Sequence, residues 1–171
     1  MNTKSYRIVI VCIATIIALL FTGCAPVISQ EVMKDVDKAI RFEQLLENPE
    51  AYQGKTVLIG GDIIEAKNYP EKTLIVVLQR PLELRNRPAA DGVSKGRFIV
   101  SISGFLDPAI YRKGRQVTVV GSVLGKEVQP LGEIEYAYPV IAKRELYLWP
   151  SDESALREPR VYFGVGVGIS F

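Results

Sequence analysis

The feature that most constrains the fold is a set of apolar segments in the middle of the chain, two of which carry glycine at their centres. Residues 56–64 (TVLIGGDII) contain Gly60 and Gly61, and residues 116–124 (QVTVVGSVL) contain Gly121. A glycine inside a strand permits a bulge or a sharp coil, so the strand can bend around the corner of a barrel. The sequence therefore predicts strands that curve.

Further segments alternate apolar and polar residues as strands do. Residues 98–103 would place apolar side chains on one face and two serines on the other. Residues 134–141 also alternate, and Pro139 within them requires a sheet edge or a bulge. Residues 80–95 contain two prolines and one glycine and are predicted to form a loop. The additional strands are predicted at residues 73–79, 98–103 and 134–141, with 145–149 extending or following the last.

Two short helices are predicted around these strands. Residues 41–48 carry apolar residues at helical spacing and are closed by Pro49. Residues 107–114 begin with Asp-Pro and end with basic residues and Gly, which indicates one or two helical turns. The resulting order of three strands, a short helix and two strands predicts a mainly β protein, an OB-like five-stranded barrel. A β-sandwich is the alternative, although it usually has more strands.

The amino-terminal segment has the layout of a secretory signal. Lys4 and Arg7 precede an apolar run at residues 8–21, and no acidic residue occurs before Glu31. As a helix, this run would span about 21 Å, which is short of the bilayer core of about 30 Å. We therefore expect residues 1–23 to be a cleaved signal peptide.

The five residues LFTGC at positions 20–24 resemble the lipobox of bacterial lipoproteins. In such precursors the thiol of the cysteine, here Cys24, receives a diacylglycerol, the signal is cleaved before it, and the new amino terminus is acylated. Phe21 departs from the pattern, since Leu is commoner there. A cysteine that merely ends a membrane anchor is the alternative. Because Cys12 would leave with the signal, the mature chain would have no thiol pair for a disulfide.

The residue after the cysteine predicts which of the two membranes holds the protein. In the enteric sorting rule, Asp at this position retains a lipoprotein in the inner membrane, whereas this chain has Ala25. We therefore expect a lipid-anchored protein of the outer membrane that faces the periplasm, with the lipoprotein processing and sorting machinery as partners. Residues 24–40 are expected to form a lipidated tether that lifts a domain at 41–150 off the lipid.

The carboxyl-terminal segment is expected to be separate from the domain. Residues 151–171 comprise a polar linker and a glycine-rich strand, of which residues 161–171 alternate apolar and small side chains. The strand ends on Phe and resembles the terminal signal read by the assembly machinery for outer-membrane barrels. A single unpaired strand cannot cross lipid, so we favour pairing with the domain edge or with a second copy. Disorder and a contact with the membrane or the machinery are the alternatives.

Composition excludes much catalytic and cofactor chemistry. The chain has 171 residues, 48% of them hydrophobic, and contains no histidine, the common imidazole base and the commonest zinc ligand. Residues 164–168 (GVGVG) are no dinucleotide fingerprint, because no helix follows. We expect no cofactor, no metal site and no enzymatic activity. Six carboxylates could in principle cleave glycans but show no paired spacing: Asp62, Glu65, Asp91, Asp107, Glu133 and Glu135.

The OB-like form raises a nucleic-acid hypothesis, which requires basic residues with stacking aromatics. Without residues 1–23, the chain has 19 basic and 19 acidic residues, which argues against a polyanion partner. We therefore expect solvated basic faces and no nucleic acid at Lys95 and Arg97 beside Phe98, and at Arg112, Lys113 and Arg115 beside Tyr111. Packing is likewise favoured over a ligand platform for Tyr136, Tyr138, Tyr147 and Trp149.

A specific series of short motifs covers residues 24–150. In order, they are CAPVIS (24–29), NP (48–49), YQGK (52–55), LQRPL (78–82), GRF (96–98), GFLDP (104–108), GRQVTVVG (114–121), YAYPVI (136–141) and LWP (148–150). This series resembles the Slp family of outer-membrane lipoproteins. The resemblance implies a diacylated and N-acylated lipoprotein of the Gram-negative outer membrane, associated with starvation and stationary-phase stress. It implies no enzymatic activity, and the one functional position it transfers is Cys24.

The leading hypothesis is a non-enzymatic, lipid-anchored envelope protein with a structural or stress-related role. The first alternative is a periplasmic binding module that holds a glycan or a peptide on the barrel face around the loop at residues 80–95. The second alternative is an enzyme acting on glycan or lipid, which would require two of the six carboxylates to converge within about 5 to 10 Å.

Overall fold

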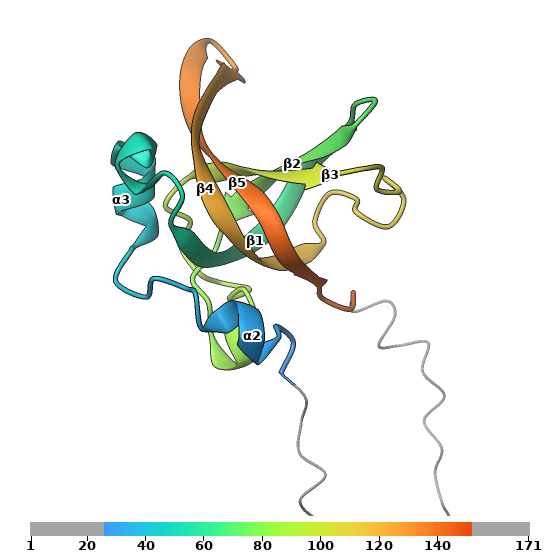
Figure 1. Ribbon diagram of the computed structural model, residues 1–171. Helices are drawn as coiled ribbons and strands as arrows, with labels where there is room; N and C mark the ends of the chain where they lie inside the picture. Colours follow the sequence, from blue (N-terminus) through green and yellow to red (C-terminus); the bar gives the residue numbers. More distant parts are fainter. Residues whose placement is uncertain (1–25, 152–171) are drawn as a thin grey trace, which may run out of the picture.

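The predicted strand segments form a closed barrel in the computed structural model, which describes residues 26–151 (Figure 1). The order around the barrel is β1-β2-β3-β5-β4, and β4 pairs with β1 to close it. The OB-like barrel prediction is therefore confirmed, and the β-sandwich alternative is wrong. The strands are β1 (Thr56–Asn68), β2 (Lys72–Gln79), β3 (Arg97–Ser103), β4 (Gln116–Leu131) and β5 (Ile134–Leu148).

The irregularity in β1 lies beyond its two glycines. The register with β2 shifts between Ile63 and Glu65, and not at Gly60 or Gly61 as the sequence suggested. The glycines instead allow close approach of the backbones. A Cβ atom on Gly61 would lie 1.9 Å from the carbonyl oxygen of Leu78 in β2, a distance that no side chain tolerates.

The last two strands are longer than predicted. β4 and β5 pair continuously to the turn at residues 132–133 and form a long hairpin (Figure 1). The register of β4 with β5 shifts between Val120 and Gly121, as expected for the central glycine. Pro139 lies just before residues 140–142, the short stretch of β5 that pairs in parallel with β3. Its position at the edge of that pairing fits the missing N–H of proline.

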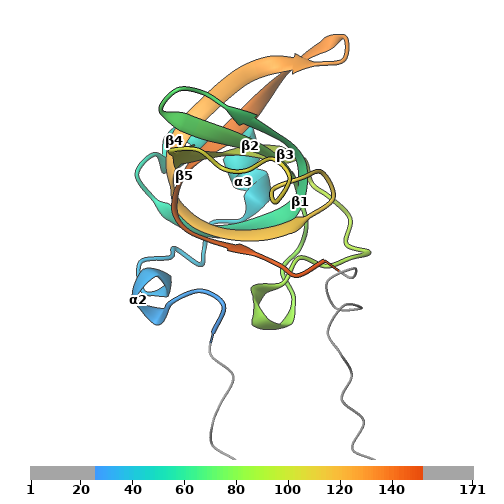
Figure 2. The ribbon, with the colours of Figure 1, turned by 90° about the vertical axis from the view of Figure 1, so that its right-hand side faces the viewer.

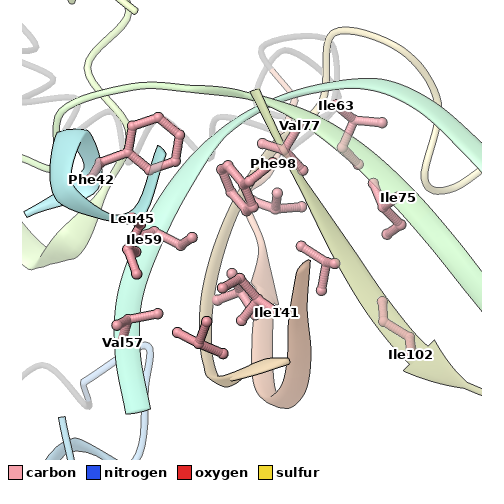
Figure 3. Close-up of a cluster of buried hydrophobic side chains, with 14 residues drawn as sticks. Phe42, Leu45, Val57, Ile59, Ile63, Ile75, Val77, Phe98, Ile102 and Ile141 are labelled. Atoms are coloured by element: carbon pink, nitrogen blue, oxygen red, sulfur yellow. The ribbon is translucent and has the colours of Figure 1, made fainter. Parts of the chain in front are cut away.

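The core fills the barrel with aliphatic side chains from all five strands (Figure 3). Residues at alternate positions point inward, such as Ile75 and Val77 in β2 and Val100 and Ile102 in β3, because strand side chains alternate between faces. Phe98 is fully buried among them. The alternation seen in the sequence is therefore the inward face of the barrel.

One end of the barrel is closed by α3 (Phe42–Glu47), the helix predicted at residues 41–48. Figure 2 looks along the barrel and shows α3 behind the ring of strands. Phe42 packs edge-on against Phe98 with ring centroids 5.9 Å apart, and Leu45 is fully buried. Pro49 ends the helix as predicted and begins a 3-10 turn, η1 (Pro49–Tyr52).

The segment between β3 and β4 makes a single hydrogen-bonded turn, the shorter of the two forms predicted for residues 107–114: the Asp107 carbonyl accepts from the backbone N of Ile110 and of Tyr111 at 3.1 and 3.0 Å. Asp107 caps the turn as expected, since its Oδ1 accepts a hydrogen bond from the backbone N of Ala109 at 2.8 Å. A second turn follows, in which the backbone N of Arg115 donates to the Arg112 carbonyl at 3.2 Å and Gly114 has φ +85°. Leu106 and Tyr111 pack against the core from this segment.

The described part of the expected tether is packed on the barrel. Ile28 is 1% exposed, and the Ser29 backbone N and hydroxyl donate to the Glu145 carboxylate at 3.0 and 2.6 Å. The short helix α2 (Gln30–Met33) follows, and Val36 bridges to Thr56 at the start of β1. From Ile28 onward the segment is therefore packed on the barrel and does not form a free tether.

Candidate functional site

The outer face of β2 and β3, on which OB folds bind their ligands, is covered by the chain itself. Val76 and Ile99 point outward and pack with Tyr138 of β5 in a second apolar cluster. Tyr138 is 3% exposed, and the Tyr136 hydroxyl accepts a hydrogen bond from the backbone N of Arg97 at 2.9 Å. This face is therefore internal packing surface.

The four aromatic residues near the end of the domain form two separate pairs. Tyr136 and Tyr138 pack edge-on with centroids 4.6 Å apart, and Tyr147 and Trp149 do so at 4.9 Å. Tyr138 and Trp149 are both buried. The packing interpretation is confirmed, and the single aromatic platform is wrong.

A cleft of about 270 Å³ lies where the binding alternative placed its ligand, beside the loop at residues 80–95. Its walls come from β1, this loop, the start of β4 and the end of the described chain. The volume is near the lower limit of about 300 Å³ for small-molecule sites, so the cleft suits one sugar ring or one side chain. We call it the loop cleft; it is lined by Asp62, Arg87, Ala90, Gly114, Arg115, Gln116, Pro150 and Ser151.

Positive charge dominates the loop cleft. Asp62 is neutralised by Arg80, whose Nε lies 2.8 Å from its carboxylate. Arg115 Nη2 donates to the uncharged carbonyl of Trp149 at 2.8 Å, and its buried Nε has no hydrogen-bond partner. Arg87 Nε donates to the uncharged Gln116 amide oxygen at 3.3 Å. Among residues 26–151, these contacts leave two guanidinium charges without an acidic partner, which suits an anionic group.

A chain of hydrogen bonds holds the loop against the barrel. The Thr118 hydroxyl accepts from Trp149 Nε1 at 2.9 Å and donates to the Asn86 carbonyl at 2.6 Å. The Arg87 guanidinium lies 5.3 Å from the centroid of the Trp149 ring. Sequence reasoning missed Arg87 and Thr118 as partners, because residues so far apart in the chain leave no spacing signal.

The six candidate carboxylates have individual structural settings. Asp62 pairs with Arg80, Glu65 with Lys67 at 3.2 Å, and Asp107 caps a turn. Asp91 is exposed in the 80–95 loop, and Glu133 and Glu135 are exposed at the β4–β5 turn. Their spread over different elements gives no support to glycan cleavage. Among residues 26–151, no three acidic, cysteine or histidine side chains are placed to hold a metal ion.

The two basic groups do not present a stacking surface. Phe98 is fully buried in the core, so it cannot stack on a base beside Lys95 and Arg97. Lys95 lies 3.9 Å from the Glu43 carboxylate, with both side chains about half exposed. Arg115 lines the loop cleft, whereas Lys113 is exposed and is not part of the lining. The absence of a nucleic-acid partner stays a prediction.

Three predictions fall outside residues 26–151. Cys24, the signal at residues 1–23 and the carboxyl-terminal strand at 161–171 all lie beyond the described part of the chain. Within it, no helix has the length and apolar character needed to cross a bilayer.

Comparison with known proteins identifies related sequences. The family model described as "Outer membrane lipoprotein Slp family" matches residues 21–167. The "Uncharacterized lipoprotein YeaY" of Escherichia coli K12 is 27% identical over 143 residues, which is 84% of this chain and 74% of that protein. "Outer membrane protein Slp" of the same strain is 25% identical over 136 residues, covering 78% and 71%.

The solved structures that match include the mitochondrial single-stranded DNA binding protein Rim1 of S. cerevisiae. It is 17% identical with a TM-score of 0.34, and the match covers 54% of this chain and 91% of that one. A TM-score this low does not establish a shared fold. The OB-like assignment therefore rests on the strand order of the barrel itself.

Proposed function

Because the chain belongs to the outer membrane lipoprotein Slp family, we propose that lipid on Cys24 holds it at the outer membrane and that its barrel serves the envelope without catalysis. The family match carries this proposal, since it starts at residue 21 and so includes Cys24. Cleavage after Gly23 would remove residues 1–23 and free the Cys24 amine for acylation. Three acyl chains at about 0.8 kcal/mol per buried methylene make detachment negligible.

A structural role under envelope stress, with the barrel facing the periplasm, is the functional part of the proposal. Its support is the barrel itself, in which the OB ligand face is packed by Tyr138 and the candidate carboxylates are paired or dispersed. The resemblance to the Slp family adds the expected association with starvation and stationary-phase stress. Deleting the gene should therefore lower survival in stationary phase, and the wild-type gene but not a Cys24→Ser copy should restore it.

Metabolic labelling with palmitate tests the anchor. The wild-type chain should incorporate label and float with the outer membrane in a density gradient, whereas Cys24→Ser should do neither and should retain residues 1–23. Equal labelling of the two chains would remove Cys24 as the lipid site. A Cys12→Ser variant is the matched control, because that cysteine is expected to leave with the signal and its loss should change nothing.

The sorting machinery is a proposed partner, and Ala25 is the residue it would read. An Ala25→Asp variant should still take up palmitate but should move from the outer-membrane to the inner-membrane fraction. Ala25→Ser is the control and should stay in the outer membrane. An unchanged distribution of the Asp variant would show that sorting here does not depend on this position.

Pairing of two copies through residues 161–171 remains a further proposal, testable by truncation and sedimentation.

A second candidate function is favoured by the loop cleft, whose two uncompensated guanidinium groups suit a carboxylate on a glycan or peptide. The probe is a peptidoglycan disaccharide-peptide, which carries several carboxylates. It should raise the melting temperature of the wild type and bind at least tenfold more weakly to Arg87→Ala. Lys113→Ala, which removes an exposed charge outside the cleft lining, should bind as the wild type does. No shift with the wild type would exclude this ligand class.

A further inference from the structure

The described chain begins against the barrel, close to the proposed lipid site. Ile28 is buried, and Ser29 is bonded to Glu145 in β5. Four peptide units separate Cys24 from Ile28, a reach of at most about 14 Å. A domain of this size is about 35 Å across. The link is thus shorter than the domain, and only the side of the barrel near Ile28 can rest on the lipid that holds Cys24.

That side also carries the tip of the loop at residues 80–95. Figures 1 and 2 both show the start of the described chain, α2 and the light-green loop together at the lower side of the molecule. The β4–β5 hairpin points the opposite way in both views. The tip of the loop is the short 3-10 turn η2 (Leu84–Asn86).

Leu84 at this tip is 87% exposed, the highest value among the large apolar side chains of residues 26–151. An isolated exposed leucine is ordinary, but the backbone here is held in a demanding conformation. Arg85 and Asn86 have φ values of 61° and 62°, and they are the only non-glycine residues of the described chain with positive φ. Consecutive left-handed residues are costly unless the surroundings fix them.

The surroundings do fix this tip. The backbone N of Glu83 donates to the Arg87 carbonyl at 2.8 Å, and the N of Asn86 donates to the Glu83 carbonyl at 2.9 Å. The Asn86 carbonyl also accepts from the Thr118 hydroxyl of β4. The loop is therefore a rigid projection that presents Leu84 to solvent, with the exposed Glu83 before it and the exposed basic residues Arg85 and Arg87 after it.

We propose that η2 is a membrane-contact tip: Leu84 enters the headgroup region of the leaflet that holds Cys24, and the two arginines that follow it, Arg85 and Arg87, lie at its phosphates. Apolar side chains with basic residues nearby bind the bilayer interface in this way. The proposal rests on the lipid anchor proposed above. It fixes the orientation of the barrel, with the loop cleft side toward lipid and the β4–β5 hairpin toward the periplasm.

Site-specific fluorescence on the full lipidated chain tests the contact. Since Cys24 would be modified, an introduced cysteine is the only free thiol. Leu84→Cys carrying a nitrobenzoxadiazole dye is reconstituted in phosphatidylethanolamine and phosphatidylglycerol vesicles with doxyl-labelled lipid as quencher. Ile134→Cys is the matched control, because Ile134 is 61% exposed at the β4–β5 turn. The dye at position 84 should lose at least half of its emission, and the dye at 134 almost none.

The outcomes separate the contact from the anchor. If the protein floats with the vesicles but the two dyes are quenched equally, or neither is, the contact is overturned while the anchor stands. If the protein does not float at all, the anchor itself fails and the contact fails with it.

Discussion

At the residue scale, Gly121 is where the barrel tolerates least change. A Cβ atom there would lie 2.2 Å from the Ala142 carbonyl oxygen of β5. Backbone atoms cannot yield as a side chain can, so Gly121→Ala should cost more than the usual 1 to 3 kcal/mol of overpacking, roughly 3 kcal/mol or greater. Urea unfolding followed through Trp149, the only tryptophan, measures this.

Gly132 supplies the control for that substitution. It has φ +64° at the β4–β5 turn, and a Cβ there meets nothing within 4 Å. Asn tolerates this conformation well, so Gly132→Asn should change the free energy of unfolding by less than about 1 kcal/mol. Equal stability of the two variants would contradict the backbone clash at Gly121.

Glu50 is the residue whose ionisation the fold alters. Its hydrogen bond with Lys126, at 3.1 Å, is the main cause that holds the pKa of Glu50 below its ordinary value. A lowered pKa means that its contribution to stability is present above the unfolded pKa and is lost as the pH falls through the folded pKa. Carboxyl NMR titration should show the Glu50 pKa rising in Lys126→Met. An unchanged Glu50 midpoint would refute the interaction.

At the scale of elements, α3 matters because it closes an end of the barrel. Leu45 is fully buried against the core, so Leu45→Ala should lower the free energy of unfolding by about 2 to 5 kcal/mol. Glu47→Ala changes an exposed position of the same helix and should stay within about 0.5 kcal/mol. A small effect at Leu45 in the same urea titration would show that α3 is dispensable for closing the barrel.

The elements also show what the sequence can predict. The order of the strands along the chain was predicted from local signals, namely the alternation in residues 98–103 and the glycines within β1 and β4. The outer half of the β4–β5 hairpin was missed because residues 125–131 (GKEVQPL) are largely exposed and leave no continuous apolar stripe. The packing of the predicted tether was missed for a related reason, since the single buried side chain of Ile28 has no periodicity.

Some candidate sites likewise have a local sequence signal, and others are visible only in the folded structure. Cys24 could be predicted as a lipid site because a lipobox is contiguous in sequence, and the loop at residues 80–95 was predicted from its prolines and glycine. The loop cleft needed the fold, because Arg87 and Arg115 meet only when β4 passes beside the loop. The exposed Leu84 gave no signal either, since its rigidity comes from backbone hydrogen bonds and from Thr118.

At the scale of the whole molecule, the short link after Cys24 determines which side of the barrel meets the lipid. A link of about 14 Å keeps the side near Ile28 at the bilayer, whereas a longer one would let the domain turn. Twelve Gly and Ser residues inserted between Ala25 and Pro26 add a root-mean-square length of roughly 19 Å and up to about 40 Å when extended. That reach is comparable with the diameter of the domain.

The insertion should therefore weaken the contact at Leu84 without detaching the protein. Dye quenching at position 84 should fall at least twofold toward the value at Ile134, while flotation with vesicles stays complete. The same twelve residues inserted at Gly132, in the distant β4–β5 turn, add equal length without lengthening the link, and should leave quenching at position 84 unchanged. Full quenching with the long link would show instead that the affinity of the tip for lipid orients the barrel by itself. A single leucine followed by two nearby arginines offers too little apolar area to do so.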